Sequence, residues 1–231
     1  MTQGKNRSRK PTPGRKVVPP VVRPWWRSAW AAAGGAVIAV GIIVVLVVAI
    51  VNGHTDQPVV SPPTQSGSPT VLAPVDSTVG GSTTDGIQCG ASESVLFHIH
   101  AHLAVYVNGQ ARIVPEGIGI TPPRQETQSG SGPFVTSGTC FYWLHSHTAD
   151  GIIHIESPVQ RTFTLGDYFD IWGQPLSASQ VGPATGTLIA YVNGTRYNGD
   201  PRAIALTAHA LVQLDVGQDV APQPFAFPAG L

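Results

Sequence analysis

The sequence predicts a mainly β domain, a small antiparallel β-sheet or sandwich-like fold with one or two short helices, preceded by a single transmembrane helix. Segments that alternate apolar and polar residues with a period of two predict the strands. Asn-Gly pairs at Asn108 and Asn193 directly follow two of these segments, and this pair is typical of tight hairpin turns. An uncharged apolar run near the N-terminus predicts the transmembrane helix.

The N-terminal segment differs in charge from the rest of the chain. Residues 1–27 hold eight of the 13 Lys and Arg residues, and no acidic residue precedes Asp56. After residue 55 there are five Arg and 13 acidic residues, a formal charge of −8. Nucleic-acid binding depends on Lys and Arg, so no nucleic-acid partner is expected for this acidic part. We interpret residues 1–27 as a disordered, basic cytoplasmic tail; a nucleic-acid-binding arm is the alternative.

Residues 28–51 are predicted to be the membrane anchor. The stretch 29–51 has 23 residues without a charge, enough to span roughly 30 Å of hydrocarbon. Basic residues before it place the N-terminus in the cytoplasm and the C-terminal part outside. A cleaved signal peptide is the alternative. We favour the anchor because the run is longer than a signal peptide's apolar core and no small-residue cleavage site follows it.

Residues 52–86 are rich in Pro, Gly, Ser and Thr and contain no aromatic residue, so they are predicted to be a linker. The folded extracytoplasmic domain is then expected over residues 87–231. It contains both cysteines of the chain, Cys89 and Cys140. An oxidising compartment outside the membrane favours a disulfide between them, and two free thiols are the alternative.

The segment 97–107 is the clearest predicted strand. Its apolar residues, among them Ile99 and Leu103, fall on one face, and His98, His100 and His102 fall on the other. The Asn-Gly pair that follows predicts a hairpin, with residues 111–114 as the return strand. Residues 115–139 are predicted to form a long loop without periodicity, either a lid over a binding site or a flexible insertion.

Further elements follow in order. Residues 140–147 and 152–156 are predicted strands, joined by a turn at Asp150-Gly151, and each has an apolar and a polar face. Apolar residues at helical spacing from Leu165 to Trp172, with Thr164 as the cap, predict a short helix that packs on the sheet. Residues 177–180 are expected to start another helical turn. Residues 188–192 and 211–216 are predicted strands, and the Pro-rich C-terminal tail is expected to pack along the surface.

The histidines predict a metal site. On a strand, side chains two residues apart leave the same face roughly 6.6–6.8 Å apart, so two imidazoles can converge on one ion. We therefore expect two of the three histidines in 97–107 to bind metal, with the third in an outer shell or on a second ion. The candidate ligands are His98, His100, His102, His145, His147, His154 and Glu156. A hydrogen-bonded core network and a pH-responsive patch are the alternatives.

The chemistry of these ligands narrows the choice of metal. Nitrogen and carboxylate ligands suit Zn, Cu(II), Ni or non-haem Fe, and we expect a divalent transition metal, Zn or Cu. Blue copper is disfavoured because the only Met is Met1 and both Cys are expected to be paired.

Four segments together resemble a known family: His98 to Leu103, Trp143 to His147, Gly151 to Pro158 and Phe163 to Trp172. The resemblance covers roughly residues 95–216. It is to an uncharacterised family of membrane-anchored, histidine-rich extracytoplasmic proteins of bacteria and archaea, for which no activity is known. It implies a prokaryotic cell-envelope setting.

The sequence therefore favours a membrane-anchored extracytoplasmic protein that binds Zn or Cu and handles the metal. One alternative is a metal-dependent hydrolase or hydratase with Glu156 as the general base. His-x-His plus a third His also matches the ligand plan of carbonic-anhydrase-like hydratases, by geometry alone. The other alternative is a metal-free envelope module whose histidine face meets a partner protein.

Overall fold

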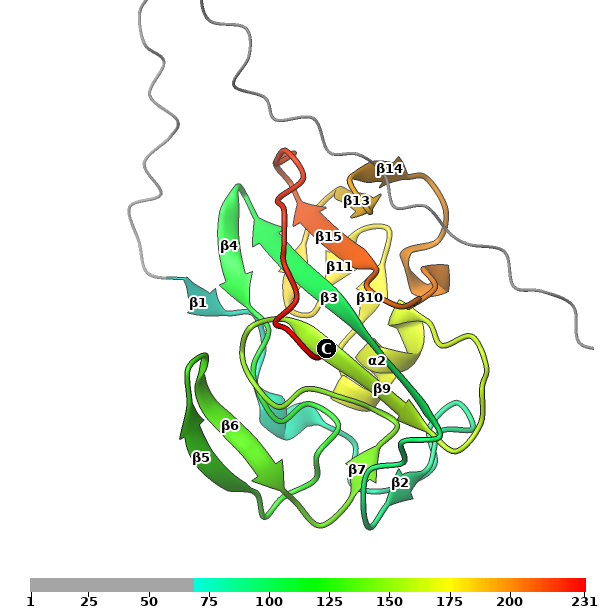
Figure 1. The fold of residues 1–231 in the computed structure, drawn as a ribbon. Helices are drawn as coiled ribbons and strands as arrows, with labels where there is room; N and C mark the ends of the chain where they lie inside the picture. The colour runs from blue at the N-terminus through cyan, green and yellow to red at the C-terminus, as the bar shows by residue number, and fades with distance from the viewer. Residues whose placement is uncertain (1–68) are drawn as a thin grey trace, which may run out of the picture. The chain divides into compact units, whose positions relative to one another are not determined.

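The structure, a computed structural model, describes residues 69–231 of the chain (Figure 1). The expected basic tail at 1–27, the expected membrane helix at 28–51 and the linker up to residue 68 lie outside the described residues. Between Pro69 and Leu231, no helix combines the length and the apolar character that crossing a bilayer requires.

Strand β3 (Phe97–Val107) is the element around which the main sheet is built. Its N-terminal half pairs with β9 (Ile152–Ser157), which pairs in turn with β8 (Leu144–His145). Its C-terminal half lies between β4 (Gln110–Ile113) and β15 (Leu211–Val216). Because β15 runs parallel to β3 while β4 and β9 run antiparallel to it, the sheet is mixed. The prediction of a mainly β fold is confirmed, but the prediction of an antiparallel sheet is corrected to a mixed one.

The sheet continues from β15 through β13 (Leu188–Val192) to β14 (Thr195–Tyr197), and from β4 to β1 (Thr70–Val71). Three smaller sheets accompany it. Their strands are β10 (Leu176–Ser177), β11 (Gln180–Val181) and β12 (Ala184–Thr185); β2 (Cys89–Gly90) and β7 (Phe141–Tyr142); β5 (Gln125–Ser129) and β6 (Gly132–Ser137). The described helices are α2 (Leu165–Trp172) and the 3-10 turns η1 (Val75–Ser77) and η2 (Pro201–Ala203).

The period-two pattern separates two faces of the sheet as predicted. Ala101, Leu103 and Val105 of β3 and Ile153 and Ile155 of β9 are buried on the core face. In Figure 1, α2 lies behind the sheet and the C-terminal tail runs in front of it, so the histidine face of β3 is on the tail side. Each fully buried aliphatic side chain contributes roughly 1.5–3 kcal/mol to folding.

Helix α2 forms as predicted. Thr164 and Asp167 make a capping box, in which each side chain accepts a hydrogen bond from the other residue's backbone N–H. Gly173 ends the helix in the left-handed conformation, with φ of 69°. The apolar side chains of the helix that were predicted to face the sheet are fully buried in the core: Leu165, Tyr168, Phe169 and Trp172. The aromatic residues of this stripe are therefore structural.

The two Asn-Gly turns also form as predicted. Asn108 and Gly109 have φ of 51° and 77°, and Asn193 and Gly194 have φ of 51° and 75°. Positive φ at both central residues is the geometry of a tight hairpin whose twist matches that of its strands. These turns join β3 to β4 and β13 to β14.

Several expectations about the connecting segments are wrong. Residues 115–139 contain the β5–β6 hairpin, so this segment is not an irregular loop. Its strands lack a clear apolar alternation because most of their side chains are exposed. Residues 177–180 belong to the β10–β11 hairpin instead of a helical turn. Residues 140–147 form two short strands, β7 and β8, that pair with different partners.

The folded region also begins earlier than residue 87. Strand β1 pairs with β4, and Leu72 and Ala73 are buried in the main core. Ser77 accepts a hydrogen bond from Gln174 and donates to the carbonyl of Trp172. The linker was predicted because residues 70–86 are rich in Thr and Gly and contain no aromatic residue. The structure shows that a few apolar side chains, such as Leu72 and Ala73, are enough to pack this segment on the core.

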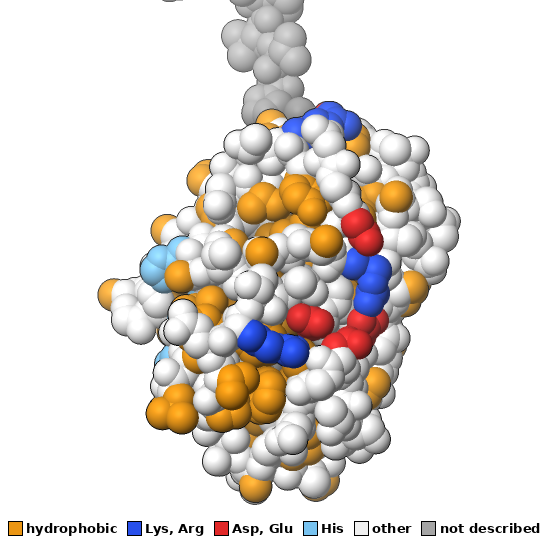
Figure 2. Space-filling view, turned by 90° about the vertical axis from the view of Figure 1, so that its right-hand side faces the viewer, with side chains coloured by type: hydrophobic (Ala, Val, Ile, Leu, Met, Phe, Trp, Pro, Cys, Tyr) orange, Lys and Arg blue, Asp and Glu red, His pale blue; other side chains and the backbone are white. Residues whose placement is uncertain are grey.

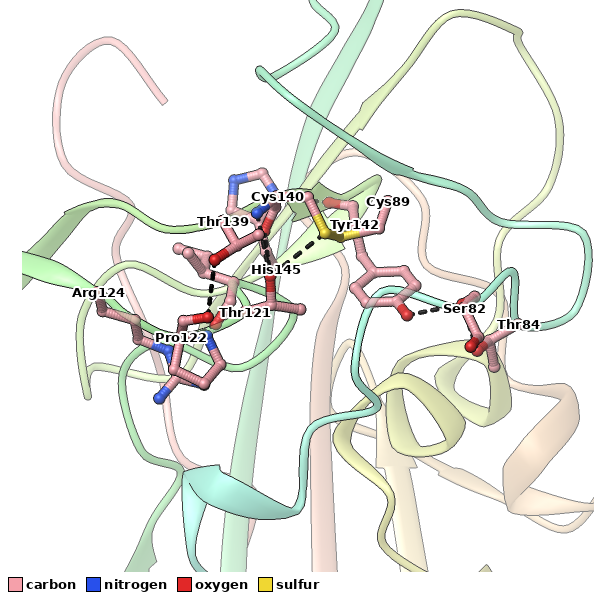
Figure 3. Close-up of a disulfide and its surroundings, with 11 residues drawn as sticks. Ser82, Thr84, Cys89, Thr121, Pro122, Arg124, Thr139, Cys140, Tyr142 and His145 are labelled. Carbon is pink, nitrogen blue, oxygen red and sulfur yellow. Dashed lines mark hydrogen bonds between the residues drawn. A yellow bond between two sulfur atoms is a disulfide. The ribbon is translucent and has the colours of Figure 1, made fainter.

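The disulfide between Cys89 and Cys140 is present, as predicted (Figure 3). It links β2 to the segment before β7, and these two strands are also paired with each other. Beside it, the hydroxyl of Tyr142 donates to the carbonyl of Ser82, and Thr121 accepts from the backbone N–H of Cys140. His145, which follows Cys140 on the same segment of chain, lies in the same close-up.

Figure 2 shows one face of the molecule, turned by 90° from Figure 1. On the part of this face that the structure describes, acidic and basic side chains lie beside one another among apolar ones. Histidine is visible only at the edge of this view.

Candidate metal centre

Three neighbouring strands bring most of the candidate ligands onto one face of the sheet. In the register of β3, β9 and β8, His100 lies opposite His154, and His154 lies opposite His145. One step along the same strands, His98 lies opposite Glu156. Cross-strand partners on one face have Cβ atoms about 4.5–5.5 Å apart, so the register alone places these side chains in contact.

A first group of donors surrounds Glu156. His98 Nε2 lies 3.0 Å from His100 Nε2 and 3.1 Å from Glu156 Oε1. His154 Nδ1 lies 3.5 Å from the same carboxylate oxygen. One ligand atom from each of these four residues lies within 4.8 Å of the others.

A second group lies on the other side of His154. His145 Nε2 and His147 Nε2 are 3.1 Å apart. Glu93 Oε1 lies 3.2 Å from His147 Nε2 and 3.8 Å from His145 Nε2. Ligand atoms of His145, His147 and His154 lie within 4.8 Å of one another, as do ligand atoms of Glu93, His145 and Glu156.

The tautomers of His145 and His147 follow from their backbone partners. His145 Nδ1 lies 2.9 Å from the carbonyl oxygen of Tyr142, and His147 Nδ1 lies 2.6 Å from that of Val135. A carbonyl oxygen only accepts, so both Nδ1 atoms must carry a proton and donate. In the neutral rings, both Nε2 atoms are therefore unprotonated, and their lone pairs are available to a cation.

Burial keeps these imidazoles neutral. His145 is fully buried, and burial lowers its pKa to about 3, helped by repulsion from His147. Burial and repulsion from His154 lower the pKa of His100 to about 4. Burial also lowers the pKa of His147 below its ordinary value. Neutral imidazole is the form that binds a metal ion.

The two carboxylates respond to the same surroundings in opposite ways. Burial raises the pKa of Glu93, and the nearby Glu156 raises it further. Burial alone would also raise the pKa of Glu156, but His154 and His145 outweigh it and hold the pKa below its ordinary value. Among the described residues, Glu156 Oε2 and His154 Nδ1 are buried atoms without a hydrogen-bond partner.

His102 does not join the cluster. Its Nε2 lies 3.1 Å from the carbonyl oxygen of Asp150, and its ring stacks on Phe225 of the C-terminal tail with 3.6 Å between centroids. Burial lowers its pKa to about 4. The residue opposite it on β9 is Ile152, which offers no ligand. Of the three candidate ligands in 97–107, His98 and His100 thus lie in the donor groups and His102 does not.

A pocket of about 640 Å³ opens beside the cluster. His98, His100, His147 and His154 line it together with both carboxylates. The β5–β6 hairpin contributes a wall through Ser129 to Ser131, Phe134 and Thr136, and the chain's C-terminal end contributes Pro228 and Leu231. The Phe134 ring stacks on His147 with centroids 4.6 Å apart. The segment that the sequence predicted as a lid or a flexible insertion thus borders the cluster.

Glu93 is the ligand candidate that sequence reasoning missed. It lies outside any alternating strand, four residues after Cys89, so no periodicity marked it. The available signal was indirect: a disulfide from Cys89 to Cys140 must bring the residues after Cys89 close to the histidines after Cys140.

The donor spacing suits a small metal ion. Four ligands at about 2.0–2.1 Å from a tetrahedral Zn²⁺ are about 3.3 Å apart. The contacts in the two groups range from 3.0 Å between His98 and His100 to 3.8 Å between His145 and Glu93. The cluster can therefore close on a metal ion with small side-chain movements.

Comparisons of the chain with protein-family models, with curated proteins and with solved structures give no match. The function is therefore inferred from the site itself.

Proposed function

We propose that this protein binds a divalent transition metal, Zn²⁺ or Cu²⁺, through its clustered His and Glu side chains and handles that metal outside the cytoplasmic membrane. The neutral, buried imidazoles and the two adjacent carboxylates support the metal-binding part. The apolar run at 28–51, the basic residues before it and the formed disulfide support an extracytoplasmic domain anchored by a single helix.

One observation carries the proposal. Two imidazoles whose Nδ1 protons are already donated to carbonyl groups have their Nε2 atoms 3.1 Å apart. Two bare lone pairs at this distance repel each other, so the arrangement needs a cation between them. Burial opposes a proton as that cation, because it lowers the pKa of both His145 and His147. A metal ion satisfies both nitrogens, and Glu93 supplies a negative charge beside them.

The open pocket favours a second candidate function, a metal-dependent hydrolase or hydratase. A metal-bound water facing the pocket would act as the nucleophile. Glu156 is poorly suited to be its general base, because it is only 4% exposed and contacts His98. Glu93, at the rim of the pocket and with a raised pKa, is better placed to accept a proton.

Burial argues against the third reading, an interaction module that presents its histidines to a partner protein. His100, His145 and His147 are at most 5% exposed, so little of their surface remains for a partner.

The test is metal content, measured by mass spectrometry on the full-length protein produced in an oxidising compartment. We expect near-stoichiometric metal in the parent and its loss in the His100→Ala/His147→Ala variant. His209→Ala is the control, because His209 belongs to neither donor group and its ring contacts Phe227 and Leu231 of the C-terminal tail. A parent that stays free of metal after incubation with Zn²⁺ and Cu²⁺ would refute the proposal.

A further inference from the structure

We propose that the cluster is a dinuclear centre, in which two metal ions share the carboxylate of Glu156. This inference rests on the proposed metal-binding function and specifies the number of ions and the ligands of each.

The number of donors is the first reason. Seven side chains converge in the cluster: Glu93, His98, His100, His145, His147, His154 and Glu156. A tetrahedral Zn²⁺ site takes four ligands, so a single ion of this kind would leave three of these donors without a metal. Five of the seven are buried or half-buried, so at least one of the donors left over lies in the interior. Polar groups in a protein interior are costly unless paired, so these spare donors require an explanation.

The spatial division of the donors is the second reason. His98 and His100 extend from β3, whereas His145 lies on β8 and His147 follows it. Strand β9 lies between them and contributes His154 at the centre, opposite both His100 and His145. The Nε2 atoms therefore form two close pairs, 3.0 Å apart on the β3 side and 3.1 Å apart on the β8 side.

The first ion lies on the β3 side. His98 Nε2, His100 Nε2 and Glu156 Oε1 face it, and His154 Nδ1 is 3.5 Å from the same carboxylate oxygen. His154 Nδ1 is buried without a hydrogen-bond partner, so this ion would satisfy it. The result is a four-ligand site of three nitrogens and one oxygen.

The second ion lies on the β8 side. His145 Nε2, His147 Nε2 and Glu93 Oε1 are 3.1–3.8 Å apart, and this set shares no residue with the four ligands of the first ion. The Nδ1–H groups of both histidines donate to backbone carbonyls, a second-shell arrangement that orients metal-binding imidazoles.

Glu156 connects the two sites. Its Oε1 contacts His98 and His154, whereas its buried Oε2 has no hydrogen-bond partner. A carboxylate oxygen of Glu156 also lies within 4.8 Å of ligand atoms of Glu93 and His145. A carboxylate with one oxygen on each ion explains the unpaired Oε2, and ions in such sites lie about 3.5–4 Å apart.

The test counts ions in the full-length protein loaded with Zn²⁺. We expect about two ions per chain in the parent and in the His209→Ala control. His98→Ala should lose the first ion and keep the second. His147→Ala should lose the second ion and keep the first. Glu93→Gln, at the half-exposed rim, should weaken only the second ion and provides a variant with little risk to folding.

The outcomes separate the two proposals. A parent without metal would overturn both the proposed function and the dinuclear centre. A parent with one ion, lost in both His98→Ala and His147→Ala, would leave metal binding standing and overturn the dinuclear centre.

A measurement on the unaltered protein guards against misfolded variants. Loaded with Cu²⁺, two ions at this separation should couple magnetically, so the electron paramagnetic resonance signal of isolated Cu²⁺ should be lost or replaced by a coupled spectrum with a half-field signal. A parent spectrum of isolated Cu²⁺ at saturating metal would overturn the inference.

Discussion

Removing His100 should weaken metal binding by the same factor at pH 7 and at pH 5. The reason is that His100 is 5% exposed and its pKa is lowered to about 4 by burial and by the neighbouring His154 and His98. Protons therefore do not compete with metal at this ligand over that pH range. An imidazole with the ordinary pKa of about 6.5 would behave differently, since most of it is protonated at pH 5.

The size of the difference can be worked out from proton competition. For a pKa of about 6.5, lowering the pH from 7 to 5 reduces the affinity that one imidazole contributes by about 25-fold. For a pKa of about 4 the same change costs only about 1.1-fold. The parent and His100→Ala should thus lose affinity in parallel as the pH falls.

The assay is a competition titration against a chelator of known affinity at each pH, on the parent and on His100→Ala. His209→Ala serves as the control because it removes a histidine outside the cluster. If the advantage of the parent over His100→Ala shrinks by about 25-fold at pH 5, then His100 titrates normally and the reasoning from burial is wrong.

Three further predictions concern stability and the support of the site. A Cβ at Gly119 would lie 2.2 Å from the carbonyl oxygen of Leu144, and the φ of Gly119 is 74°. Gly119→Ala should therefore lower the free energy of unfolding by at least about 1–2 kcal/mol and reduce the metal content by displacing β8. Urea unfolding tests the first effect, and metal analysis tests the second. The pKa of His102 falls from 6.5 in the unfolded chain to about 4 in the folded one, so the folded protein loses stability as the pH falls below 6.5. Between pH 7 and pH 5, the free energy of unfolding should therefore fall by about 2 kcal/mol less in His102→Gln than in the parent. Equal losses in parent and variant would contradict this prediction. Breaking the disulfide with Cys89→Ser/Cys140→Ser should cost about 4 kcal/mol for a sequence separation of 51 residues. Urea unfolding of the variant against the oxidised parent measures this cost, and a cost near zero would contradict the prediction.

Local patterns predicted much of the fold because alternation in a strand is a property of the backbone itself. The pleat of a strand sends successive side chains to opposite faces of the sheet, whatever the neighbouring strand is. It therefore puts Ile153 and Ile155 on one face and His154 and Glu156 on the other. The helix from Leu165 was equally readable, since its cap and its apolar spacing act within a few residues.

Segments whose structure depends on distant partners were not predictable in this way. Strand β1 is two exposed residues that become a strand by pairing with β4. The β5–β6 hairpin has mostly exposed side chains, so no apolar face marked it in the sequence.

The sequence by itself determined the chemistry of this protein's site: imidazole and carboxylate side chains, most of them placed on the polar faces of alternating segments. Only the tertiary structure decided which of them meet. The register of β3 against β9 sets His100 opposite His154 but His102 opposite Ile152, so one histidine of the triplet is left to the C-terminal tail. The chain that follows the disulfide brings Glu93 to His147. Both results depend on strand pairing and on chain closure between distant segments, and neither leaves a signature in the local pattern of residues.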